Sequence, residues 1–178
     1  MEELDELTAA VLRARRGDAV AAADFVRASQ PDVWRFCAAL GSPSTADDLT
    51  QETYARAFGS LHRFAGRSSA RTWLFAIARR VCADAVRSAV RLRSAPAPTP
   101  PRPGADPADS VTLRALLDAL DGDRREAFVL TQLVGLSYAE AADVCGCPVG
   151  TIRSRVARAR ADLVDGFGVT PGSASATS

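Results

Sequence analysis

A proline-rich stretch divides this chain into two parts. Residues 94–108 read SAPAPTPPRPGADPA and hold six prolines in fifteen positions. Proline lacks the backbone N–H that a helix needs, so the stretch favours extended, polyproline-like conformations. We therefore expect a flexible tether, which at about 3 Å per residue can separate two domains by roughly 45 Å.

Both parts carry the patterning of short helices. Hydrophobic residues make up 47% of the 178 positions but aromatic residues only 6%, so a core must be built mainly from Ala, Val and Leu, which suits helices. The predicted fold class is all-α, with two small helical domains joined by a Pro-rich flexible linker. The expected boundaries are 1–93 for the first domain, 94–108 for the linker, 109–166 for the second domain and 167–178 for a disordered tail.

Start and stop signals place the helices of the first part. The predicted helices run over about 4–16, from Asp18 to about 30, from Pro31 to about 40, over 46–61, and over 73–93. Pro31 is assigned to a helix start because a first helical position tolerates a missing N–H. That helix carries Val33, Trp34 and Phe36 in its apolar pattern, and Ser44 or Thr45 is the expected cap of the next one.

A helix-turn-helix is predicted from Gly135 to Leu163. Ser137 and Glu140 have the spacing of a capping box, which starts a helix at Tyr138. Gly146 can adopt the positive φ of a tight turn, and Pro148 suits the start of the second helix. On a helical wheel, one side of the second helix is apolar, formed by Ile152, Val156, Ala159 and Leu163.

The opposite side of that second helix carries arginine, hydroxyl and small residues. Candidate DNA contacts on it are Thr151, Arg153, Ser154, Ala157, Arg158 and Arg160. Arginine can fork onto guanine O6 and N7 in the major groove, and small residues permit close approach. A second basic block lies at 62–95, with eight arginines and one acid, although the net charge of the chain is only +1. Two basic blocks suit a protein that touches a polyanion at two places.

Other function classes find little support. The single histidine, His62, has no partner that would make a nucleophile–base pair, and no glycine loop could cradle a phosphate, so we expect no enzyme. The cysteines include no CxxC pair, so neither a metal nor another cofactor is expected. No run of 18 apolar residues and no secretion signal is present, which predicts a cytoplasmic protein without membrane insertion.

Three segments together resemble the extracytoplasmic-function (ECF) branch of the bacterial sigma-70 family. They are DDLTQETYARAF (47–58), FAGRSSARTWLFAIARR (64–80) and GLSYAEAADVCGCPVGTIRSRVARAR (135–160). The resemblance implies a sigma factor that binds core RNA polymerase, reads the −35 duplex and captures the melted −10 strand. It also implies contacts with the β′ clamp helices and the β flap of polymerase, and it makes an anti-sigma factor a candidate partner.

The resemblance assigns roles to particular residues. Asp47, Asp48, Leu49, Gln51 and Glu52 match the segment that docks on the clamp helices. Arg67, Ser68, Ser69, Arg71, Arg79 and Arg80 match the segment that opens and holds the −10 element. Without the family resemblance, the helix dipole alone could account for Asp47 and Asp48, because carboxylates are stabilised near the N-terminus of a helix. The remaining alternative function is a stand-alone helix-turn-helix regulator, which would bind duplex DNA without polymerase.

Overall fold

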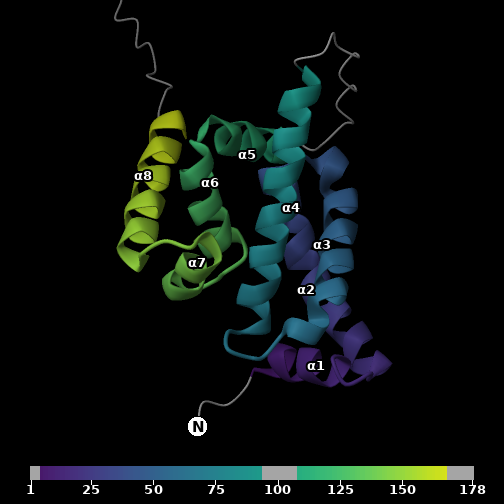
Figure 1. The fold of residues 1–178 in the computed structure, drawn as a ribbon. Helices are drawn as coiled ribbons and strands as arrows, with labels where there is room; N and C mark the ends of the chain where they lie inside the picture. Colours follow the sequence, from purple (N-terminus) through teal and green to yellow (C-terminus); the bar gives the residue numbers. More distant parts are fainter. Residues whose placement is uncertain (1–4, 94–107, 168–178) are drawn as a thin grey trace, which may run out of the picture.

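The computed structural model describes residues 5–93 and 108–167, and every regular element among them is a helix (Figure 1). The prediction of an all-α fold is confirmed for these residues. The predicted tether, apart from Ala108, and the predicted tail from 168 onwards lie outside the described residues. None of the described helices is long and apolar enough to cross a bilayer.

Four helices form the N-terminal half. They are α1 (Glu6–Ala14), α2 (Ala19–Leu40), α3 (Ala46–Ser60) and α4 (Ala70–Arg93), with single turns of 3-10 helix at Pro43–Thr45 and Leu61–Arg63. Asp5 and Asp18 start the first two helices, because their carboxylates accept from the backbone N–H groups of Thr8 and Ala21. Edge-to-face contact between Phe36 and Phe75, with ring centroids 5.3 Å apart, ties α2 to α4.

Pro31 does not start a helix, as the sequence had suggested, but lies inside α2. An interior proline costs a helix about 3 kcal/mol. The apolar face of α2 nevertheless runs without interruption past this position, since Phe25, Val33 and Phe36 are all at most 1% exposed. Burial of a large side chain contributes about 1.5–3 kcal/mol, so packing on both sides of Pro31 outweighs the lost hydrogen bond.

The C-terminal half contains α5 (Ala108–Ala119), α6 (Gly122–Phe128), a π-helical turn η3 (Val129–Leu133), α7 (Tyr138–Cys145) and α8 (Val149–Phe167). The predicted capping box is present, with Ser137 and Glu140 each bonded to the other's backbone N–H. Gly146 has the predicted positive φ, at +64°. The predicted helix-turn-helix is therefore confirmed. Its capping box and its turn each depend on residues only a few positions apart.

The two halves pack side by side along α4, which contacts α7, while α2 contacts η3 (Figure 1). Arg114 of α5 reaches across to the end of α2, where its guanidinium donates to the carbonyl oxygens of Ala38 and Gly41. The Ala38 carbonyl lies in the last turn of α2, and the Gly41 carbonyl directly follows the helix. Carbonyls at the C-terminal end of a helix have no hydrogen-bond partner within it. Arg114 of the C-terminal half thus supplies hydrogen-bond donors to the C-terminal end of α2 in the N-terminal half.

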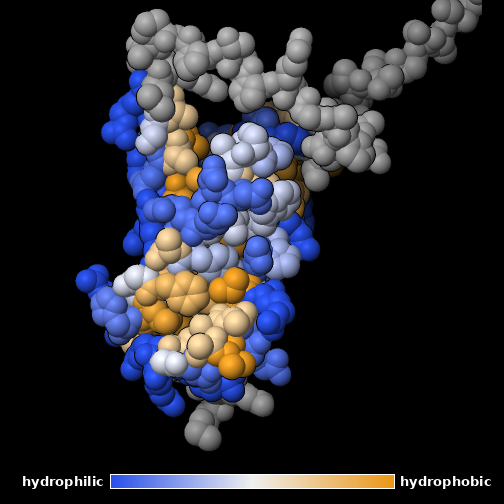
Figure 2. All heavy atoms as spheres, turned by 90° about the vertical axis from the view of Figure 1, so that its right-hand side faces the viewer, coloured by the Kyte–Doolittle hydropathy of each residue, from blue (hydrophilic) through white to orange (hydrophobic). Residues whose placement is uncertain are grey.

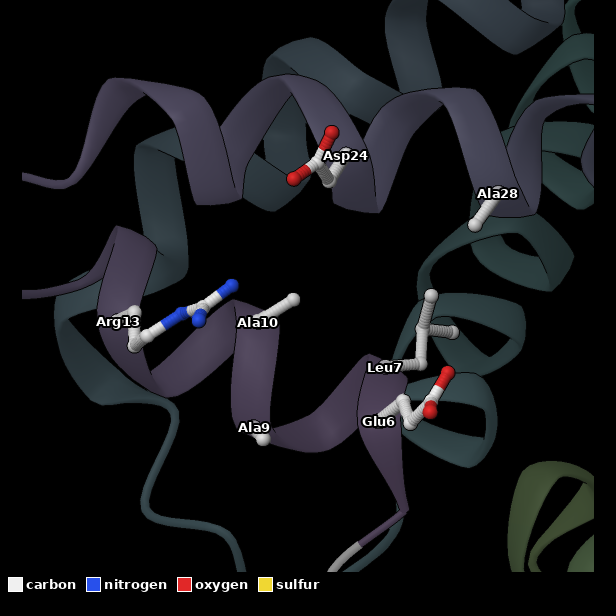
Figure 3. A pocket seen from close by; sticks show the side chains of 7 residues that line it. All are labelled: Glu6, Leu7, Ala9, Ala10, Arg13, Asp24 and Ala28. Carbon is white, nitrogen blue, oxygen red and sulfur yellow. The ribbon is translucent and has the colours of Figure 1, made fainter.

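A hollow of about 500 Å³ lies between α1 and α2 (Figure 3). Three of its seven lining residues are alanines, Ala9, Ala10 and Ala28, and Arg13 and Asp24 extend into it from opposite sides. None of the residues predicted to contact DNA or polymerase lines this hollow.

Candidate nucleic-acid interface

Helix α8 presents two unlike faces. Its predicted apolar side is confirmed as buried, since Ile152, Val156, Ala159 and Leu163 are at most 9% exposed. Arg153, Ser154, Ala157 and Arg158 are exposed on the other side. A helix face of small residues flanked by arginines can approach base edges closely.

The four arginines of α8 differ in whether their guanidinium groups bind another side chain. Arg155 is ion-paired with Asp123 and Arg160 donates to the Gln132 side chain at 2.7 Å. The side chains of Arg153 and Arg158 make no hydrogen bond or ion pair with any other residue that the structure describes. These two guanidinium groups are therefore available to an external partner, and Arg155 is partly committed to holding α8 against α6.

The loop before α4 is fixed by a chain of hydrogen bonds. Thr8, which is 2% exposed, accepts from the backbone N–H of Ala70 at 2.8 Å and donates to Asp5 at 2.7 Å. Ser69 caps α4 by accepting from the backbone N–H of Thr72 at 3.1 Å. The loop conformation is thus set by α1, although nothing in the local sequence of the loop indicates this.

The predicted −10 residues fall into two groups. Arg67, Ser68 and Arg80 are exposed and make no hydrogen bond or ion pair with other described residues. Ser69, Arg71 and Arg79 instead contact the C-terminal half. Arg71 donates to the Val134 carbonyl at 2.7 Å and to the Asp32 carboxylate at 2.9 Å, and Ser69 donates to Glu140 at 3.3 Å.

Arg79 makes the most enclosed of these contacts. Its Nε lies 2.6 Å from Oε1 of Glu126, a residue that is only 8% exposed. Burial lowers the pKa of Arg79, but the hydrogen bond and the charge of Glu126 outweigh it, so the pKa is raised overall. The guanidinium therefore stays charged and is held by the Glu126 carboxylate.

A cleft of about 650 Å³ separates the two halves at the same place. Arg67, Ser68 and Ser69 line one wall, and Glu140 and Asp143 of α7 line the other. Acidic side chains thus face the loop that sequence resemblance assigns to the −10 strand. A DNA strand that entered this cleft would meet those carboxylates, which repel phosphate.

The acidic segment of α3 also divides in two. Asp47, Asp48, Gln51 and Glu52 are exposed, whereas Leu49 is buried at 8% exposure. Glu52 is paired with Arg56, which also binds Asp84 and lowers the pKa of that carboxyl. Asp47 accepts from the indole Nε1 of Trp34 at 2.8 Å.

The cysteines lie in packed surroundings. Cys37 and Cys82 are buried, with their sulfurs 3.9 Å apart. Cys145 donates to Glu126 at 3.7 Å, and burial raises the pKa of its thiol to about 12. No cluster of three or more His, Cys, Asp or Glu side chains suited to a metal occurs within 5–93 or 108–167.

Three residues of this surface have no signal in the sequence analysis. Asp32, Glu126 and Trp34 bind Arg71, Arg79 and Asp47 respectively. Glu126 is itself only 8% exposed, and a buried acid needs a partner, but its burial is visible only in the structure. Asp32 and Trp34 take up their positions through contacts between helices. The periodicity of hydrophobic residues along one helix contains no information about such contacts.

Comparison with known proteins decides the family. "Sigma-70 region 2" matches residues 25–92 and "Sigma-70, region 4" matches residues 110–163. The chain is 51% identical to the ECF RNA polymerase sigma factor SigC of Mycobacterium tuberculosis over 173 residues, covering 90% of each chain. The chain belongs to the ECF sigma factors. The alternative of a stand-alone regulator is not favoured, because the N-terminal half is itself a sigma region.

Two solved structures share the fold of this sigma factor. CnrH in complex with the cytosolic domain of CnrY has a TM-score of 0.76 and 28% identity, covering 92% of this chain and 97% of that one. The sigma factor RpoE in complex with the anti-sigma factor NepR, from Bartonella quintana, has a TM-score of 0.71 and 32% identity, covering 83% and 99%. The recognition of an ECF sigma factor from three sequence segments is thus confirmed.

Proposed function

We propose that the two halves act as separate domains of a non-catalytic initiation factor in the cytoplasm. Residues 1–93 would bind core polymerase and the −10 element, and residues 109–166 would read the −35 duplex, with 94–108 as the tether. The single observation that best supports this is the exposed face of α8, where Arg153 and Arg158 have no partner among the described residues. Thr151, Ser154, Ala157 and Arg160 would complete that face.

The −10 element would be held by Arg67, Ser68, Ser69, Arg71, Arg79 and Arg80. Capturing an unpaired base offsets the few kcal/mol that unstacking costs, and arginines neutralise the phosphates beside it. Because Ser69, Arg71 and Arg79 now bind the C-terminal half, we infer that the halves separate when polymerase and promoter bind.

Asp47, Asp48, Leu49, Gln51 and Glu52 would form the polymerase-docking segment, with the buried Leu49 supporting the helix rather than touching the partner. RpoE is bound to an anti-sigma factor in the structure with this fold, so a comparable inhibitor is a candidate partner here.

Run-off transcription tests the proposal. Purified bacterial core polymerase is assayed with and without the protein on promoter fragments from the same genome. New, discrete start sites that require the protein are the expected result. Tight binding to duplex DNA by the protein alone, with no transcript from core polymerase, would refute it.

A further inference from the structure

Trp34 lies outside the core, on a helix whose apolar face is buried. The residue is 39% exposed, whereas Val33 and Phe36 have no exposed surface. Its indole Nε1 donates to the Asp47 carboxylate of α3 at 2.8 Å, which fixes the ring near the junction of the two helices. An aromatic ring with its N–H satisfied and part of its apolar body in water is typical of protein interfaces.

The charge around this ring is negative and uncompensated. Neither Asp47 nor Asp48 forms an ion pair within the described residues. The arginines on the same stretch of α2 do not neutralise them, because Arg27 binds Asp24 and Arg35 binds Asp32. An indole face beside a carboxylate that has no ion-pair partner among the described residues therefore suits a cation, which gains a π contact and an ion pair together.

Trp34 differs from the exposed valines among the described residues, which have neither an aromatic ring nor an N–H donor on the side chain. Figure 2 views the molecule from the α3 side, where apolar side chains gather mainly over the end near α1, away from Asp47 in the first turn of α3. Val20, at the start of α2, is 71% exposed. A valine offers no π face, so it provides a matched control for loss of exposed apolar surface.

We propose that Trp34 and Asp47 form the centre of the polymerase-docking surface and receive an arginine or lysine side chain of the polymerase. The inference rests on the proposed function and adds a residue and a partner chemistry to it. The Asp47 carboxylate holds the indole in place, and the indole covers the aliphatic part of the incoming side chain.

Affinity measurements with intact core polymerase test the pair. Trp34→Ala is expected to weaken binding about ten-fold or more, as truncation of an interface tryptophan commonly does. Trp34→Phe retains a ring and should lose less, and Val20→Ala should bind like the wild type. Asp47→Asn still accepts the indole N–H but lacks the charge, so it should weaken binding and reduce its salt dependence. Circular dichroism and thermal unfolding establish that each variant is folded.

A spectroscopic signal separates docking from general stability. With 5-fluorotryptophan incorporated, the chain gives two ¹⁹F resonances, from Trp34 and Trp73, and Trp34→Phe assigns them. Adding unlabelled core polymerase should shift the Trp34 resonance. An unshifted resonance, or Trp34→Ala binding as tightly as Val20→Ala, would overturn the inference while wild-type binding persists. If the wild type does not bind core polymerase at all, the proposed function fails instead.

Discussion

Arg79 of α4 and Glu126 of α6 are joined by an ion pair with Nε and Oε1 2.6 Å apart. The other carboxylate oxygen of Glu126 accepts from Cys145 at 3.7 Å, so both oxygens are engaged. The pair connects the N-terminal half to the C-terminal half through a residue that the family resemblance assigns to the −10 element. If Arg79 binds a −10 phosphate as proposed, it must release this carboxylate, so the two uses would compete.

Replacing Glu126 by Gln should therefore favour separation of the halves. Loss of one partner from a partly buried charged hydrogen bond costs about 1–3 kcal/mol, or about five- to 150-fold in the equilibrium between closed and open forms. We expect a larger radius of gyration in small-angle X-ray scattering and tighter binding of single-stranded −10 DNA.

Asp162→Asn is the matched control for that variant. Asp162 pairs with Arg124 inside the C-terminal half, so its replacement removes the same charge without touching the contact between halves. Equal effects of the two variants on DNA binding would mean that net charge alone is responsible. An unchanged radius of gyration for Glu126→Gln would contradict the competition.

Arg153 and Arg158 should carry most of the −35 affinity of α8. Each lost base contact is expected to cost about 1–3 kcal/mol, so Arg153→Ala and Arg158→Ala should weaken binding of a −35 duplex. Arg124→Ala removes the same charge from an arginine that is already paired with Asp162. Binding is measured by fluorescence anisotropy with holoenzyme, and affinities equal to that of Arg124→Ala would exclude α8 as the reading helix.

Local signals in the sequence predicted the C-terminal half well. The capping box at Ser137, the turn at Gly146 and the buried side of α8 each depend on residues a few positions apart. Such signals specify backbone geometry without reference to the remainder of the chain. The docking and −10 segments were identified by family resemblance, and their assigned roles remain predictions.

Tertiary contacts account for what the sequence did not predict. Pro31 is a local reason to start a helix, but buried side chains on both sides of it keep α2 continuous. Trp34 fitted an apolar stripe, yet the indole turns to Asp47, which lies 13 positions away. Glu126 and Arg79 are 47 positions apart, so no periodic pattern could have paired them.

The thiol of Cys145 should be unusually unreactive. With its pKa raised to about 12 by burial, the Cys145 thiol is far less ionised at pH 8.5 than an ordinary cysteine, about half of which is then ionised. We expect iodoacetamide to label Cys145 more than a hundred-fold more slowly in the native chain than in urea, as followed by peptide mass spectrometry. Equal rates in the two conditions would contradict the burial of this thiol.

The same shift has a consequence for stability. The native thiol keeps its proton at pH values where the unfolded thiol has lost it, so the native state binds more protons. The contribution of Cys145 is complete below the ordinary thiol pKa and falls as the pH rises towards about 12. Cys145→Ser should therefore reduce the loss of stability between pH 8 and 10, measured by urea unfolding.

Two glycines, one directly after α2 and one within α3, should respond oppositely to replacement by alanine. A Cβ at Gly41 would lie 2.7 Å from the Leu49 side chain and 2.9 Å from the Cys37 carbonyl oxygen. Overpacking of this kind costs about 1–3 kcal/mol, and it would also disturb the Gly41 carbonyl that accepts from Arg114.

Gly59, within α3, has open space where an alanine would place its Cβ, with no atom within 4 Å. Gly59→Ala should therefore stabilise the fold by about 0.5–1 kcal/mol. Urea unfolding gives both changes in the free energy of unfolding from the shift in the midpoint, provided that the dependence on urea concentration is unchanged. If Gly41→Ala were as stable as the wild type, the end of α2 would have to shift to make room for the methyl group.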